Sequence, residues 1–172
     1  MKSRAWLSIL SAITLVTLAT IQGATASEME YMKVQQTEAV FTGYLHNVEW
    51  AEGTWVAKLN EIEWYEGEAA KAKFEEQEGQ SGEEGPPDGY YIIDSDSSIT
   101  SLPIATDAVV LMQIYNRTGK AEEADIIWNE QIGLKEFITL IEENEDWSMR
   151  DYPYHCTVQD GKIIRIVQQY IP

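Results

Sequence analysis

The stretch of residues 61–94 constrains the fold more than any other part of this chain. It holds two aromatic strand candidates, one that ends at Trp64 and one at residues 90–93, on either side of a helix candidate and a loop candidate. Ala70 and Phe74 lie four residues apart, so residues 68–78 are predicted to form a helix with one buried stripe. Residues 79–85 contain no apolar side chain and predict a mobile loop. The stretch therefore reads as strand, helix, loop and strand, and is predicted to anchor the main sheet.

A hairpin is predicted before this stretch. Residues 40–50 and 54–64 are rich in β-formers, and Glu52-Gly53 between them favours a turn. Gly43 inside the first strand indicates a bulge or a close approach of another backbone. Ile62 and Trp64 follow a register change at the end of the second strand.

Three further strands are predicted in the next part of the chain. Residues 102–104 are expected to form an extended edge segment, because Pro103 has no backbone donor for a ladder. The apolar run 108–115 is expected to be a central strand, and residues 125–130 a short one.

The last forty residues combine a helix and a hairpin. Leu134, Phe137, Ile138 and Ile141 follow helical spacing and predict a helix over residues 133–144. Asp160-Gly161 separates two strand candidates, 153–159 and 162–170, as in a two-residue hairpin.

A two-residue loop would set the register of that hairpin. It would pair Val158 with Ile163 on one face, and Thr157 with Ile164 and His155 with Ile166 on the other. Both faces are then partly apolar, so the hairpin is expected to be covered on both sides.

Together these elements predict an α+β fold. About seven strands would form a mostly antiparallel sheet or small barrel with two packed helices, in one domain spanning residues 39–172.

Residues 1–26 are predicted to be a secretory signal peptide. Lys2 and Arg4 precede an apolar run over residues 5–21, and Ala24 and Ala26 suit cleavage after Ala26. The run is close to the lower limit for a spanning helix, so a retained anchor is the alternative. Residues 27–38, here called the lead-in, are polar and predict a flexible segment. The expected location is extracellular or at the cell envelope.

The net charge of −17 disfavours several partners. Such a surface repels nucleic acid and anionic membranes, and suits cations or a basic partner. Cys156 is the only cysteine, which excludes an intramolecular disulfide, and its apolar strand pattern predicts a buried thiol.

No catalytic, cofactor or metal motif is complete. Residues 94–98 resemble the start of a calcium loop, but Ile99 and Ala105 stand where glycine and glutamate are needed. His46 and His155 are the only histidines, and each is expected at a half-exposed strand position rather than in a metal site. We therefore predict no cofactor, no metal site and no catalytic residue.

Aromatic side chains are the weak ligand-binding candidates. Trp64, Tyr65, Tyr90 and Tyr91 would form a platform for a carbohydrate or peptide if exposed, and part of the core if buried. The core interpretation is the more typical of β-rich domains.

Three segments resemble a known group of proteins. Residues 63–70, residues 87–92 and the C-terminal Gln-Tyr-Ile-Pro are similar to segments of small uncharacterised proteins exported by Bacillus-type and actinobacterial cells. The resemblance implies a Gram-positive exported protein and supplies no activity and no site residues.

The expected function is non-catalytic binding of an unknown protein, peptide or carbohydrate outside the membrane. The alternative is a small secreted hydrolase that uses paired carboxylates near Glu61–Glu66. A cation-binding accessory protein is a third class.

Overall fold

The computed structural model describes residues 31, 33–79, 84–95, 98–118, 122, 124–142 and 147–171. The predicted signal peptide and most of the predicted loop 79–85 lie outside these residues. The fold is α+β, as predicted, and its elements are β1 (Val40–Ala51), β2 (Thr54–Glu61), β3 (Glu63–Glu66), α1 (Gly67–Glu78), β4 (Tyr90–Ile93), β5 (Ile99–Tyr115), β6 (Asp125–Ile132), α2 (Leu134–Glu142), a 3-10 turn (Met149–Asp151), β7 (Pro153–Gln159) and β8 (Lys162–Gln168).

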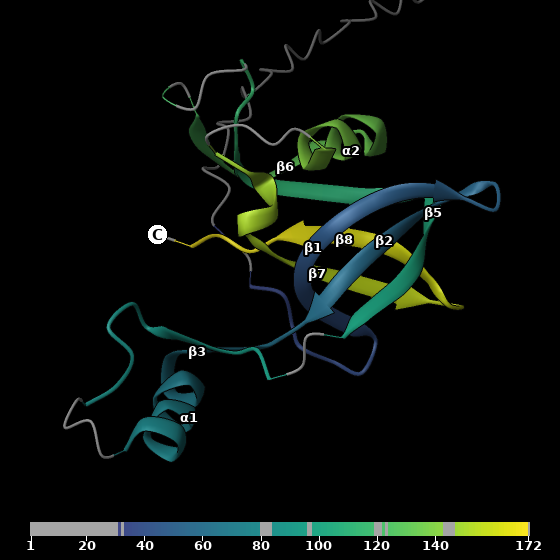
Figure 1. Cartoon of the computed structure of the whole chain (residues 1–172). Coiled ribbons are helices and arrows are strands. Elements are labelled where there is room, and N and C mark those ends of the chain that lie inside the picture. The colour runs from purple at the N-terminus through teal and green to yellow at the C-terminus, as the bar shows by residue number, and fades with distance from the viewer. Residues whose placement is uncertain are drawn as a thin grey trace, which may run out of the picture.

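Five strands close into a small barrel (Figure 1). Their order is β2-β1-β7-β8-β5, β2 also pairs with β5 to close the ring, and β6 extends from β5. All of these neighbours run antiparallel except β5 and β8, which are parallel. Closure removes the exposed edges that an open sheet of this size would have.

Strand β5 corrects the prediction of two separate segments. It is one strand of 17 residues, and Pro103 lies inside it opposite Val56 of β2. Pairing with β8 begins only at Ile104, so Pro103 has a ladder partner on one side. Proline has no backbone N–H to donate, and at this position β5 has no partner on the side of β8. Pro103 is therefore tolerated here, although β5 is not an edge strand.

The first hairpin forms as predicted. Glu52 and Gly53 connect β1 and β2 with positive φ angles of 51° and 80°, which match the twist of a tight hairpin. The predicted close approach at Gly43 is confirmed, because an added Cβ would lie 2.2 Å from the carbonyl oxygen of Asn60.

The C-terminal hairpin also forms, with a different register from the one predicted. Val158 pairs with Ile163 as expected, but a register shift follows. Thr157 then lies opposite Arg165 rather than Ile164, and His155 opposite Val167 rather than Ile166. The two wrong pairings follow from this irregularity, which the apolar pattern did not indicate.

The stretch β3-α1-β4 forms a unit outside the barrel. β3 and β4 make their own two-stranded sheet, and α1 packs on it through the buried side chains Ala70 and Phe74. The prediction that these aromatic strands anchor the main sheet is therefore wrong. β2 ends at Glu61, Ile62 still donates its backbone N–H to Thr42 O of β1 at 2.9 Å, and β3 beyond it pairs with β4 instead of a barrel strand.

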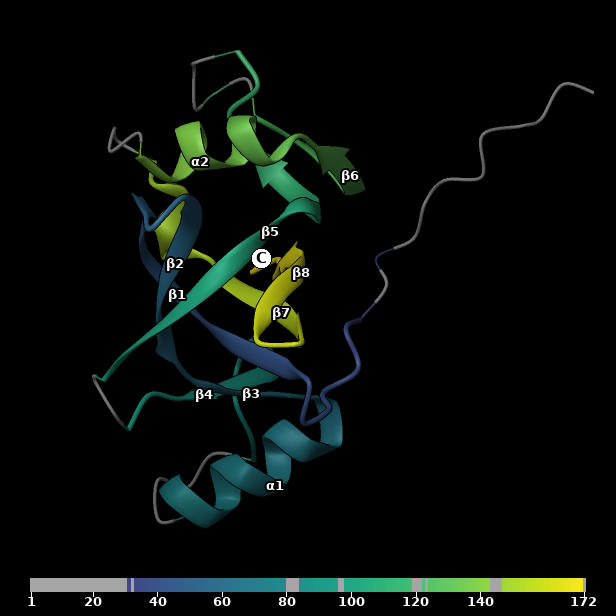
Figure 2. The same cartoon turned by 90° about the vertical axis from the view of Figure 1, so that its right-hand side faces the viewer.

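The barrel lies between this unit and α2, which are at opposite ends of the molecule (Figure 2). Phe137 and Ile141 of α2 are fully buried, and the Phe137 ring meets that of Tyr154 edge to face at 5.5 Å. Tyr154 and Cys156 of β7 both belong to the core, and the buried thiol is as predicted. Since side chains alternate along a strand, His155 between them lies on the opposite face of β7, outside the barrel core.

Candidate binding pocket

A pocket of about 520 Å³ lies on the outer face of β1 and β7. Its floor comes from the barrel, one wall from residues 33–36 of the lead-in, and the other from residues 61–66 and Ala69. We call it the outer pocket. Its volume is within the range of small-ligand sites in proteins.

The floor of the pocket is a buried imidazole. His155 is 1% exposed, so the prediction of a half-exposed histidine is wrong. Its Nδ1 atom lies 2.9 Å from Thr42 Oγ1 and 3.1 Å from Gln36 Nε2. Its Nε2 atom lies 2.8 Å from Gln169 Oε1. The lead-in and β3 cover the outer face of β7, which is why a histidine on that face is buried.

This environment favours the neutral ring. Burial lowers the pKa of His155, and the hydrogen bond to Gln169 and the charge of Glu66 oppose that shift only in part. In the neutral form Nε2–H donates to Gln169, and Nδ1 accepts from Gln36. The Thr42 hydroxyl has one proton, which it gives either to Gln36 Oε1 at 3.0 Å or to Nδ1 at 2.9 Å.

The lead-in wall is attached through three side chains. The hydroxyl of Tyr31 donates to Gln169 Oε1 at 2.6 Å, and Lys33 forms an ion pair with Glu66. Gln36 reaches His155, as described above. Burial, followed by the nearby charge of Glu66, raises the pKa of Tyr31 to about 12, which keeps this phenol a hydrogen-bond donor.

The other wall contains two of the predicted aromatic residues. Trp64 is 9% exposed and stacks on Tyr90 with ring centroids 4.8 Å apart. Its Nε1 donates to Glu66 Oε1 at 3.0 Å. Tyr65 also lines the pocket, and its hydroxyl donates to Glu63.

The four aromatic candidates do not form one exposed platform. Trp64 is buried, while Tyr65, Tyr90 and Tyr91 are half-buried. Tyr91 packs edge to face on Phe74 of α1 at 5.6 Å, and Tyr90 serves as the stacking partner of Trp64. The pocket is lined by Trp64 and Tyr65 alone among the four.

The carboxylates predicted for the alternative function, a small hydrolase, also line this pocket. Glu61, Glu63 and Glu66 all line it. Glu66 accepts from Trp64, pairs with Lys33 and lies 3.4 Å from Gln169 Nε2. Within the described residues, no cluster of three or more histidine, cysteine, aspartate or glutamate side chains has the arrangement of a metal site.

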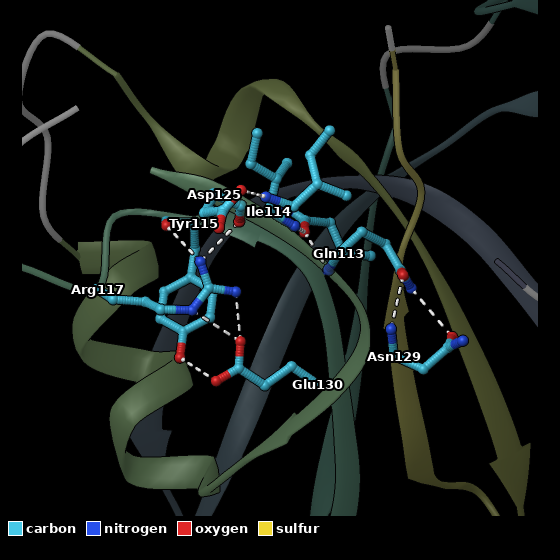
Figure 3. A network of polar contacts seen from close by, with 9 residues as sticks. Gln113, Ile114, Tyr115, Arg117, Asp125, Asn129 and Glu130 are labelled. Atoms are coloured by element: carbon cyan, nitrogen blue, oxygen red, sulfur yellow. Dashed lines mark hydrogen bonds and ion pairs between the residues drawn. The ribbon is translucent and has the colours of Figure 1, made fainter. Parts of the chain in front are cut away.

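A second polar network joins β8, β5 and β6, and Gln113, Ile114 and Asn129 of this network are seen in Figure 3. Gln168 Oε1 accepts from the backbone N of Gln113 at 2.8 Å and of Ile114 at 3.0 Å, where the β5–β6 register is irregular. Gln113 in turn accepts from Asn129 N at 2.9 Å. These amides supply hydrogen bonds that the ladder lacks at this point, which gives the network a structural role.

The same close-up shows Arg117 between β5 and β6 (Figure 3). Its Nε donates to Glu130 Oε2 at 2.8 Å, and its guanidinium lies 4.3 Å from the Tyr115 ring centroid. The charge is thus neutralised within the molecule and offers no free anion site.

Sequence reasoning missed the residues that matter most to the pocket, namely Gln36, Thr42 and Gln169. One signal was present, since Gln168 and Gln169 follow an apolar strand and must occupy opposite faces. Gln168 is directed to the barrel interior and Gln169 to the outer pocket.

Among the residues that the structure describes, no helix is long and apolar enough to cross a membrane. Comparison of the chain with protein-family models, with curated proteins and with solved structures found no match.

Proposed function

We propose that this protein is a non-catalytic, exported binding protein whose ligand site is the outer pocket. The observation that carries the proposal is a 520 Å³ cavity built over the buried His155 and its amide partners. Its walls combine apolar side chains such as Val34 and Ile62 with fixed hydrogen-bonding groups, a combination typical of small-ligand sites.

A ligand screen with a blocking variant tests the proposal. The probes are chitotetraose, maltotriose and a set of short peptides, and the measurement is the melting temperature together with tryptophan fluorescence. A ligand at 100 times its Kd should stabilise the fold by about 2.7 kcal/mol. Val34→Trp should fill the cavity and abolish the shift, because Val34 lines it.

Thr106→Trp is the matched control, since Thr106 is exposed on β5 and does not line the pocket. It should leave the shift unchanged. Absence of binding by every probe, or equal binding by the Val34→Trp variant, would contradict the assignment of the ligand site.

A hydrolase is the second candidate, because Glu61, Glu63 and Glu66 line the same pocket. It is the weaker one, since Glu66 is already engaged by Lys33 and Trp64, and Glu63 by Tyr65. Release of 4-methylumbelliferone from a panel of glycosides, lost in Glu61→Gln and Glu63→Gln, would favour the hydrolase over the binding protein.

Export rests on the sequence of residues 1–26 alone. Secretion from a Gram-positive host, followed by mass spectrometry of the N-terminus, tests it. A chain that begins at Ser27 in the culture medium is the expected result, and a cell-bound chain that keeps its first residues would indicate an anchor.

A further inference from the structure

Among the described residues of the lead-in, Lys33 and Gln36 are attached to the outer pocket by side-chain contacts. In the part of the chain that the structure describes, residues 33–36 make no backbone–backbone hydrogen bond, and the first such bonds near them involve Thr37 and Ala39. The side chain of Lys33 remains 64% exposed. A segment held in this way can be exchanged for another without breaking a strand ladder.

Three contacts of the described lead-in residues share one polarity, although Gln36 Oε1 also accepts from Thr42 Oγ1. Tyr31 donates a hydroxyl, Lys33 an ammonium and Gln36 a carboxamide N–H, and the protein accepts each one. The acceptors are Gln169 Oε1, Glu66 and His155 Nδ1. If the lead-in left, these acceptors would face the pocket without their donors.

We infer that the outer pocket binds an extended cationic peptide segment of a partner protein, and that Tyr31 and residues 33–36 occupy part of that site in cis. This inference rests on the proposed function and names the ligand class of the same site. The ligand must supply a cation for Glu66 and neutral donors for His155 and Gln169.

The charge of the molecule supports this ligand class. The chain has a formal charge of −17, and Glu61 and Glu63 extend the acidic wall beyond Glu66. Such a surface raises the association rate of a basic partner. The empty volume beside the lead-in leaves room for side chains larger than those present in cis.

Spacing favours a peptide over a compact cation. The three donors come from positions 31, 33 and 36, and the described residues 31 and 33–36 belong to no helix or strand. Six residues of fully extended chain would reach about 20 Å. Donors distributed over that length match an extended main chain with alternating side chains, as in other peptide-recognition sites.

Competition between peptide and lead-in provides the test. The probe is the acetylated and amidated peptide Tyr-Met-Lys-Val-Gln-Gln, whose sequence is that of residues 31–36 and whose only charge is that of its lysine. Its affinity is measured by calorimetry for the purified protein and for the double variant Lys33→Glu/Gln36→Ala. The variant should bind at least about tenfold more tightly, because a tethered segment competes at an effective concentration in the millimolar range.

Two controls separate specific binding from charge attraction. Lys135→Glu/Gln131→Ala carries the same charge change at exposed positions outside the pocket, and should bind like the unmodified protein. A scrambled peptide of the same composition should bind at least tenfold more weakly to the Lys33→Glu/Gln36→Ala variant.

Glu66→Gln in the background of that double variant should reduce peptide affinity at least tenfold. Three outcomes would overturn the inference. The peptide could bind the unmodified protein and the double variant with equal affinity, or the scrambled peptide could bind as tightly as the peptide itself. The third is no binding to a double variant whose circular dichroism spectrum is unchanged. If the peptide does not bind while chitotetraose or maltotriose binds and is blocked by Val34→Trp, the peptide ligand class is contradicted and the proposed binding function is supported. If no probe binds, both proposals are contradicted.

Discussion

The Nε2 atom of His155 lies 2.8 Å from Oε1 of Gln169, and this contact fixes which ring nitrogen carries the proton. The Nε2 amide of Gln169 is directed to the carbonyl of Tyr170 at 2.8 Å and to Glu66 at 3.4 Å. Its Oε1 must then face the imidazole as an acceptor, so His155 donates from Nε2. The floor of the outer pocket is therefore an ordered arrangement of neutral donors and acceptors.

We expect stability to fall as the pH drops below about 6.5, the ordinary pKa of histidine. Burial lowers the pKa of His155 in the folded state, so the unfolded chain takes up a proton first. The contribution of this group is complete above the unfolded pKa and is lost as pH falls toward the folded one, at a slope of at most about 1.4 kcal/mol per pH unit. Urea denaturation at pH 7.5, 6.5 and 5.5 measures it.

His155→Gln should flatten that pH dependence, whatever it does to absolute stability. His46→Gln is the control, because His46 is exposed, and it should keep the slope of the unmodified protein. An unchanged slope in His155→Gln would show that other groups cause the dependence.

Gln168→Leu should destabilise the barrel by about 2–4 kcal/mol. The side chain is fully buried, and its loss leaves the backbone N–H groups of Gln113 and Ile114 without their acceptor, each at a cost of about 1–3 kcal/mol. Chemical denaturation gives the value. Gln159→Leu, at an exposed position of β7, should change stability by less than about 0.5 kcal/mol.

Gly43→Ala should destabilise the fold by about 1–3 kcal/mol. Its Cβ would lie 2.2 Å from the backbone oxygen of Asn60, so β1 and β2 must move apart to accept it. Gly133→Ala is the matched control, since nothing lies within 4 Å of an added Cβ there. Thermal melts of both variants make the comparison, and equal losses would contradict the steric account.

Phe74→Ala should loosen the β3-α1-β4 unit without unfolding the barrel. Phe74 is a main buried side chain of α1 and packs on Tyr91 at 5.6 Å. Hydrogen exchange should accelerate in residues 67–78 and 90–93, while β7 and β8 keep their protection. The exposed neighbour Glu75→Ala should leave exchange unchanged. Acceleration throughout the barrel would mean that the unit and the barrel unfold together.

The helices and hairpins could be predicted from the sequence because the residue patterns that specify them are local. Leu134, Phe137, Ile138 and Ile141 repeat with helical spacing and form α2, although it begins at Leu134 and ends at Glu142. Ala70 and Phe74 form the buried stripe of α1. Both two-residue turns also formed where they were predicted.

Barrel closure and the outer pocket were decided by tertiary structure. The pairings of β2 and β8 with β5 join strands far apart in sequence, and no local pattern specifies them. Alternation along β7 predicts only that His155 and Cys156 lie on opposite faces of the strand. Whether the face of His155 meets solvent depends on the lead-in and β3, which cover it.

The sequence by itself thus determined the local elements, the buried thiol of Cys156 and the acidic surface, because each follows from neighbouring residues or from composition. The tertiary structure alone decided that His155, Gln169, Gln36 and Glu66 meet around one cavity. Those residues come from four separate parts of the chain, and only the closed barrel with its external unit brings their hydrogen-bonding groups within contact distance.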